Sequence, residues 1–133
     1  TCIGAQRSAN TPSLFSYAES IGARVVLART LKTEGLGEAQ AVLARIMERQ
    51  APFHITICCD VFAAAHAPGV SAPQPLGLDP ETVLTLLRPL FASPHLMVFD
   101  LAEVSPRFDA DHLTARLAGI LIFSLINTRT GSG

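Results

Sequence analysis

The chain has 133 residues, of which 49% are apolar and 16% are charged, and its formal net charge at pH 7 is −1. This length suits one domain rather than two, and the apolar fraction excludes an intrinsically disordered chain. The charge balance lacks the basic excess of a nucleic-acid-binding protein, and the longest apolar stretch, residues 117–126, is shorter than the ~20 residues of a membrane span.

The first half of the chain contains two expected strands, each followed by a helix. The first strand covers residues 2–5, and a helix then begins at Thr11, which can cap it ahead of Pro12 at the first helical position. The second strand covers residues 24–28, and its helix covers residues 38–50. The apolar face of the first helix, which we expect to be buried, consists of Leu14, Phe15, Ala18 and Ile21.

The second half repeats this alternation around a long loop. Residues 53–59 form a nearly continuous apolar run, which predicts a strand buried on both faces. A loop rich in Pro, Gly and Ala covers residues 63–77, and loops of such length are often functional. Asp79 should cap the next helix. The fourth strand covers residues 96–101, and Asp111 should cap the last helix, which we expect to be deeply packed.

Repeated strand–helix units predict an α/β fold: a three-layer α/β/α sandwich with a parallel sheet. We expect this domain over residues 1–126 and a polar, flexible tail over residues 127–133. In open parallel sheets, ligands bind at the carboxyl ends of the strands. Polar side chains that follow the expected strands are therefore candidate site residues: Gln6, Arg7, Ser8, Asn10, Asp60, Asp100 and Glu103.

Two of these positions have an open interpretation. Cys58 and Asp60 lie two residues apart, so they share one face and could present a thiolate and a carboxylate to one metal ion. Alternatively, Asp60 caps a turn and Cys58 is a small core residue. Glu103 is either a solvated loop carboxylate or a group that binds a cationic amidine or guanidine through paired hydrogen bonds.

The three cysteines, Cys2, Cys58 and Cys59, are too few for a disulfide framework. Cys58 and Cys59 are neighbours on an expected strand and would point to opposite faces, so they should not bridge each other. We therefore expect a reducing, cytoplasmic setting.

Two segments resemble motifs of the ureohydrolases, the family that includes arginase, agmatinase and formimidoylglutamase. Residues 56–62 and 67–73, which read T-I-C-C-D-V-F and A-P-G-V-S-A-P, resemble the third metal motif of that family. Residues 99–109, which read F-D-L-A-E-V-S-P-R-F-D, resemble its closing motif together with the Thr-Ala pair at 114–115. These segments and residues 7–11 are most similar to the formimidoylglutamase branch.

The resemblance implies the C-terminal portion of an arginase-like enzyme that hydrolyses the C–N bond of a linear amidine. In the formimidoylglutamase branch, N-formimidoyl-L-glutamate becomes L-glutamate and formamide, in histidine degradation. The family uses two Mn²⁺ ions bridged by a hydroxide. By their motif positions, Asp60 and Cys58 would be metal ligands. Glu103 would be the catalytic group that holds the cationic end of this small-molecule substrate, and Arg7 and Asn10 would contact the substrate.

Other features depart from the family pattern. Cys58 stands where the family has an aspartate, and Mn²⁺ prefers oxygen ligands to a soft thiolate. The earlier metal motifs G-G-D-H and D-x-H-x-D do not occur in the chain.

Thr114 and Asp100 match motif positions that we interpret as structural.

In the family's sheet, a strand from the N-terminal part lies between the first and third strands of this chain. We therefore expect two separate strand pairs, completed by an N-terminal portion of the same protein or by another chain in an oligomer. The chain alone should then be inactive.

Two other hypotheses remain open. The first is a degenerate, non-catalytic ureohydrolase-like fragment with a structural or interaction role, which Cys58 and the absent motifs suggest. The second is a flavodoxin-like binding domain, which would have one contiguous sheet and a ligand at its switch point.

Overall fold

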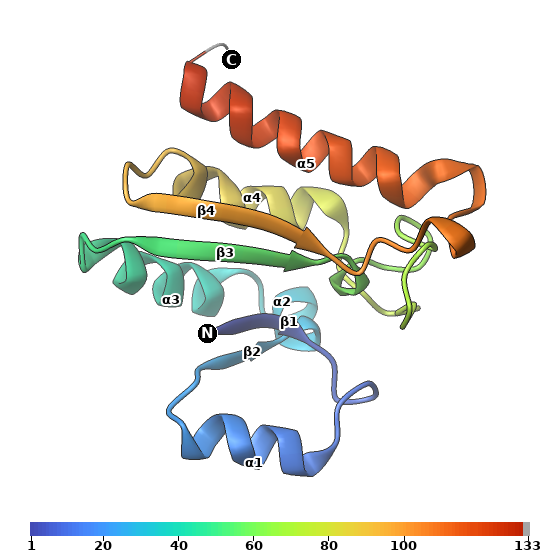
Figure 1. The fold of residues 1–133 in the computed structure, drawn as a ribbon. Coiled ribbons are helices and arrows are strands. Elements are labelled where there is room, and N and C mark those ends of the chain that lie inside the picture. The colour runs from blue at the N-terminus through green and yellow to red at the C-terminus, as the bar shows by residue number, and fades with distance from the viewer. Residues whose placement is uncertain (132–133) are drawn as a thin grey trace.

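The computed structural model describes residues 1–131, in which each strand is followed by one or two helices and the strands run in one direction (Figure 1). The strands are β1 (Cys2–Ala5), β2 (Val25–Leu27), β3 (Phe53–Cys58) and β4 (Leu96–Ala102). The helices are α1 (Pro12–Ser20), α2 (Ala28–Thr33), α3 (Gly37–Glu48), α4 (Pro80–Phe91) and α5 (Leu113–Thr130). Short 3-10 helices occupy the loops: η1 (Cys59–Val61), η2 (Pro106–Phe108) and η3 (Ala110–His112).

The strands form two separate parallel pairs. β1 pairs with β2 and β3 pairs with β4, and no ladder joins the two pairs within residues 1–131. A cavity of about 510 Å³ lies between β1 and β3, with apolar residues of α3 and α4 in its wall. The expected gap between the first and third strands is confirmed, and the contiguous sheet of a flavodoxin-like domain is wrong for this chain.

β3 is buried on one face only, which corrects the expectation that both of its faces are covered. Ile57 is buried and Ile55 packs against the core. His54, Thr56 and Cys58 alternate with them and are exposed. Successive side chains of a strand point to opposite faces. The burial of β3 therefore alternates from residue to residue, although its sequence is almost continuously apolar. The face that carries His54 is left uncovered by the helices of the described chain.

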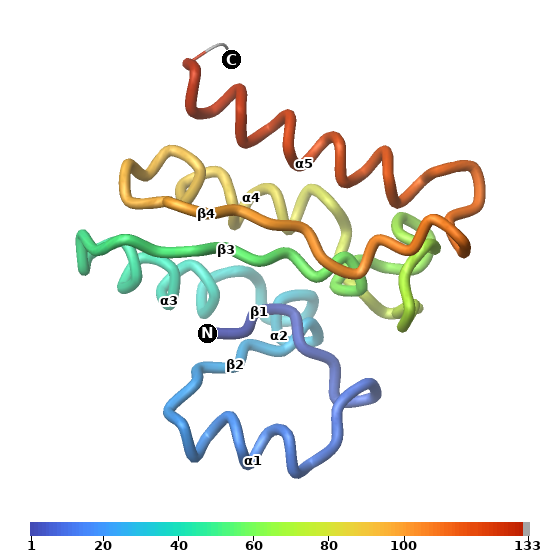
Figure 2. The backbone as a smooth tube through the Cα atoms, in the orientation of Figure 1, coloured from blue at the N-terminus to red at the C-terminus, as the bar shows by residue number. Residues whose placement is uncertain are grey.

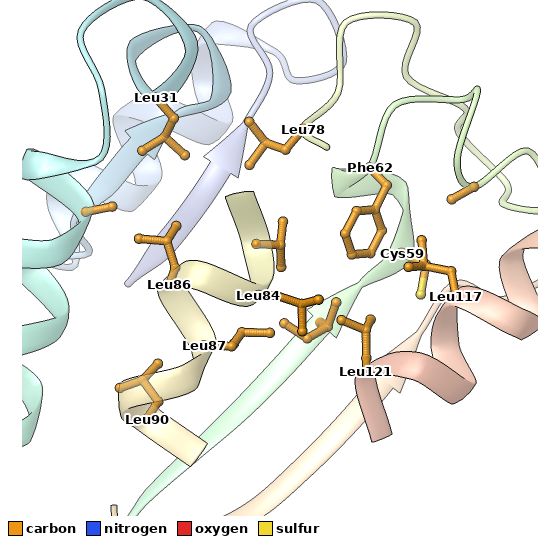
Figure 3. Packing of buried hydrophobic residues seen from close by; sticks show 14 of the residues in the cluster. Leu31, Cys59, Phe62, Leu78, Leu84, Leu86, Leu87, Leu90, Leu117 and Leu121 are labelled. Atoms are coloured by element: carbon orange, nitrogen blue, oxygen red, sulfur yellow. The ribbon is translucent and has the colours of Figure 1, made fainter. Parts of the chain in front are cut away.

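The core lies between α4, β3, the loop that follows β3, and α5 (Figure 3). Its largest buried side chains include Phe62, Phe91, Leu78 and Leu121. The leucines of α4 that join them are Leu84, Leu86, Leu87 and Leu90. Asp79 caps α4 as expected, since its carboxylate accepts a 2.8 Å hydrogen bond from the backbone N–H of Thr82.

Helices α1 and α5 are packed less completely than their apolar patterns predict. No residue of α1 is buried, and Leu14 is 54% exposed. Thr11 takes the N-cap position of α1, but its hydroxyl bonds the Ser13 hydroxyl rather than a backbone amide. On α5, the exposed large apolar side chains are Leu113, Ile120, Ile122, Phe123 and Ile126. No helix in the described part of the chain has the length and hydropathy to cross a bilayer.

The ends of α5 also differ from expectation. Asp109, rather than Asp111, caps the helix, because its carboxylate accepts hydrogen bonds from the backbone N–H groups of Thr114 and Ala115 at 2.8 and 2.9 Å. The helix continues beyond residue 126 to Thr130. In this last turn, Arg129 donates a 3.2 Å hydrogen bond to the carbonyl of Ser93. Of the expected tail, residues 132–133 lie outside the described residues.

Candidate functional site

The carboxyl ends of β3 and β4 bring three candidate side chains together. Asp60 lies in η1, directly after β3, and Glu103 directly follows β4. Cys58 is opposite Ala102 in the parallel register, so Glu103 comes one residue after that pair. The Cys58 thiol forms a hydrogen bond with Asp60, and the charges of Asp60 and Glu103 both act on it. These residues form one polar site at the edge of the sheet.

The surroundings of Cys58 hold its thiol in the neutral form. Partial desolvation, the hydrogen bond with Asp60 and the two carboxylate charges raise the pKa of Cys58 to about 12. At neutral pH the side chain is therefore an S–H group, and a metal ion would have to displace its proton. Cys59 is fully buried, and burial and the charge of Asp60 raise its pKa to about 11, as expected of an inert core thiol.

The donor chemistry tests how well the family's Mn²⁺ ions would fit. Asp60 offers the oxygen ligand that Mn²⁺ prefers, whereas the neutral Cys58 thiol does not. Among residues 1–131, no three His, Cys, Asp or Glu side chains form a group that could hold a metal ion. The residues of this chain therefore supply only part of a metal-binding site, in which Asp60 is the suitable ligand.

Glu103 occupies a strained position in the backbone. Its φ is 65°, in the left-handed region, which costs a non-glycine residue about 1–3 kcal/mol and persists only where the surrounding structure holds it. The Ser71 hydroxyl donates a hydrogen bond to Oε2 of Glu103. The backbone N–H of Ser105 donates to the carbonyl of Gly69 at 2.7 Å. The loop of residues 63–77 thus lies beside the segment that follows β4 (Figure 2).

A buried contact behind the site fixes this loop to α5. The backbone N–H of Gly69 donates a 2.8 Å hydrogen bond to the hydroxyl of Thr114, which is fully buried. A Cβ at Gly69 would lie 2.6 Å from the Cα of Asp109, so only glycine fits this approach. Burial would raise the pKa of Asp109, but hydrogen bonds from Thr114 and Ala115 outweigh it and lower the pKa. These are the contacts of a structural residue, as we interpret Thr114.

Arg7 and Asn10 lie in the loop after β1. Strand β1 itself comes close to η1 at Gly4, where an added Cβ would lie 2.4 Å from a methyl group of Val61. The Arg7 guanidinium lies 5.3 Å from the centre of the Phe15 ring. Asn10 donates a 2.8 Å hydrogen bond to the carbonyl of Gln6. Arg7 thus contacts helix α1 and Asn10 bonds within its own loop, and their role as substrate contacts stays a prediction.

Two contacts could not be anticipated from spacing. Ser71 lies 32 positions from Glu103; the length of its loop and the A-P-G-V-S-A-P segment point to the loop but not to this contact. Asp100 lies opposite Thr56 in the register and pairs with His54 on the uncovered face of β3 and β4. The His54 contact is the main reason that the pKa of Asp100 is lowered. His54 thus has a partner on the sheet.

Comparisons with known proteins place this chain in a family. A family model described as the arginase family matches residues 1–127. A formimidoylglutamase from Clostridium tetani is 44% identical over 127 residues, which are 96% of this chain and 38% of that protein. A formimidoylglutamase from Legionella pneumophila is 40% identical over 127 residues, which are 96% of this chain and 40% of that protein. The chain therefore spans about two-fifths of the length of these curated relatives.

Solved structures agree on the fold. A formimidoylglutamase from Bacillus subtilis superposes with a TM-score of 0.86 at 21% identity, covering 95% of this chain and 40% of its own. An arginase from Bacillus caldovelox gives a TM-score of 0.79 at 20% identity, covering 97% of this chain and 42% of its own. The match over residues 1–127 and these superpositions lead to one conclusion: the chain belongs to the arginase family and has the corresponding part of its α/β fold.

Proposed function

We propose that this chain is the C-terminal portion of a metal-dependent amidine hydrolase that converts N-formimidoyl-L-glutamate and water to L-glutamate and formamide, in histidine degradation. The observation that carries the proposal is the convergence of Asp60 and Glu103 at the ends of neighbouring parallel strands. The similarity to proteins named formimidoylglutamase supports this substrate over other amidines. The three free cysteines favour a reducing, cytoplasmic setting for the enzyme.

In this mechanism, Glu103 binds the cationic end of the substrate. An amidinium group presents parallel N–H donors, and a carboxylate accepts them in paired, charge-assisted hydrogen bonds. Asp60 would hold a divalent cation, and such an ion, when bound, supplies an activated water and stabilises developing negative charge. Water adds to the amidine carbon, and the bond to the glutamate nitrogen breaks. That nitrogen takes up a proton, while formamide keeps the other nitrogen.

The proposal requires a second portion of polypeptide. The gap between β1 and β3 has two unpaired, parallel strand edges and an apolar wall. Exposed strand edges bind further strands readily. We propose that an N-terminal portion of the same protein, or another chain in an oligomer, fills the gap and brings the remaining metal ligands. The chain alone would then be inactive.

One observation favours a second candidate function, a non-catalytic role. The pKa of Cys58, raised to about 12, leaves a neutral thiol where a metal ligand is expected. If this thiol prevents metal binding, the chain would serve only as a structural partner. A Cys58→Asp variant separates the two functions, because it supplies an oxygen ligand at the same position.

The test is a chimera in which residues 1–127 replace the matching segment of the Clostridium tetani relative. We expect the purified chimera, with Mn²⁺ added, to release formamide and glutamate from N-formimidoylglutamate in equal amounts. The Glu103→Gln variant is the matched control, since it keeps the shape of the side chain and removes its charge.

The outcomes separate the candidates clearly. Release that depends on Mn²⁺ and on Glu103 supports the hydrolase. Release only after Cys58→Asp supports the non-catalytic role for the natural chain. A folded chimera that binds Mn²⁺ but releases no formamide, with either residue at position 58, would refute the hydrolase proposal.

A further inference from the structure

We propose that Ser71 is a positioning residue that fixes the carboxylate of Glu103 in the orientation that receives a cationic amidine. The inference rests on the proposed function and adds to it a residue that selects for this substrate class. It is drawn from the hydrogen bond between the Ser71 hydroxyl and Oε2 of Glu103, and from the backbone that surrounds both residues.

The two segments run past each other in opposite directions. The carbonyl of Gly69 accepts a hydrogen bond from the N–H of Ser105 at 2.7 Å, and two residues further along the loop, Ser71 meets Glu103. One backbone hydrogen bond and one side-chain hydrogen bond, two residues apart on each segment, thus join the loop to the segment after β4 and hold Ser71 beside Glu103.

The loop that carries Ser71 is anchored to α5 and to Asp109 through Gly69. Gly69 is buried, its N–H is bonded to the fully buried hydroxyl of Thr114, and its Cα packs against Asp109. The Glu103 side chain is exposed, and its backbone lies in the left-handed region. The Ser71 hydroxyl links the rigid loop to this exposed carboxylate.

The chemistry of the contact suits a cationic ligand. A hydroxyl is a neutral donor, so it restrains the carboxylate and leaves its negative charge intact, whereas a lysine or arginine partner would neutralise it. Oε2 keeps further acceptor capacity and Oε1 is left to accept. The carboxylate is thus oriented for the paired N–H groups of an amidinium.

The first experiment measures side-chain order in the 133-residue chain itself. Three-bond NMR couplings about the Cα–Cβ bond of Glu103 should report one rotamer in the natural chain and in Ser71→Thr, which keeps the hydroxyl. They should report averaging among rotamers in Ser71→Ala. Ser105→Ala is the matched control, because the bond from Ser105 comes from its backbone N–H. Unchanged couplings in Ser71→Ala would overturn the positioning role.

The second experiment uses the Clostridium tetani chimera. Ser71→Ala should raise KM for N-formimidoylglutamate by roughly tenfold to a hundredfold, the effect of losing a hydrogen bond to a charged group, with a smaller change in kcat. Ser71→Thr should restore KM. A KM that does not move would overturn the role in substrate binding. If the unmutated chimera releases no formamide, the proposed function fails, while the NMR couplings still decide whether Ser71 positions Glu103.

Discussion

The hydrogen bond between Gly69 and Thr114 gives the sharpest test of how the loop is held. Thr114→Val replaces the hydroxyl with a methyl group of similar size, and it leaves the backbone bond from Thr114 to Asp109 in place. The N–H of Gly69 then stays buried without an acceptor. Leaving such a donor unpaired costs about 1–3 kcal/mol. The added methyl group recovers at most about 0.8 kcal/mol of apolar burial, so the unpaired N–H alone predicts a net loss of about 0.2–2 kcal/mol. Loss of the hydrogen bond from the Thr114 side chain to Asp109 adds to it.

Urea unfolding, followed by circular dichroism, measures this loss. Complete native domains have a free energy of unfolding of about 5–15 kcal/mol, so the variant, measured in the Clostridium tetani chimera, should remain folded with a lower urea midpoint. Thr85→Val, at an exposed position of α4, is the control and should change stability by less than about 0.5 kcal/mol. Hydrogen exchange at Gly69 should also become faster in Thr114→Val. If both variants unfold alike and Gly69 stays protected, Thr114 does not hold the loop.

Three further predictions concern charges and titration. Glu103→Gln in the chimera should lower kcat/KM by about a hundredfold or more, because two charge-assisted hydrogen bonds are weakened; formamide release measures this. Iodoacetamide at pH 8 should modify Cys2 and spare Cys58 although both are exposed, because a pKa of about 12 leaves roughly one thiol in ten thousand ionised. Mass spectrometry of the digested chain locates the label, and equal labelling would contradict the neutral thiol. Asp79→Ala should destabilise the chain by about 1 kcal/mol near neutral pH. Because the N-cap bonds to Thr82 lower the pKa of Asp79 from 3.8, this difference should persist down to about pH 4 and shrink as the natural carboxyl takes up its proton at lower pH. A difference that is independent of pH would argue against the cap.

The alternation of strands and helices could be predicted because it depends on local features. Asp79 and Pro80 specify the start of α4 through a side-chain acceptor and a fixed φ, and no distant contact is needed. The start of α5 could not be predicted in this way. Asp109 caps it across a 3-10 turn in which Asp111 has a φ of 54°, so the nearer aspartate, which sequence rules favour, is the wrong one.

The sequence was enough to predict the two main carboxylates of the site, but not the contacts that surround them. Asp60 and Glu103 end their strands, and parallel pairing brings strand ends together. The state of Cys58 depends on both carboxylates at once, so it follows only from the three-dimensional arrangement. The same holds for Ser71, whose partner lies 32 positions away. Contacts between distant loops leave no periodic signal in the sequence.

The distribution of the exposed apolar side chains explains the low charged fraction of the chain. They cluster on α1, β4 and α5 and include Tyr17, Met97, Val98 and Phe123, each more than half exposed. Proteins that act alone rarely leave extended apolar surfaces in water. The uncovered face of β3 and the gap beside β1 belong to the same pattern. A portion that supplied one strand would fill the gap but leave these helices exposed, so the proposed completing portion must also cover helical surfaces. It must therefore be a folded layer of the domain rather than a single added strand.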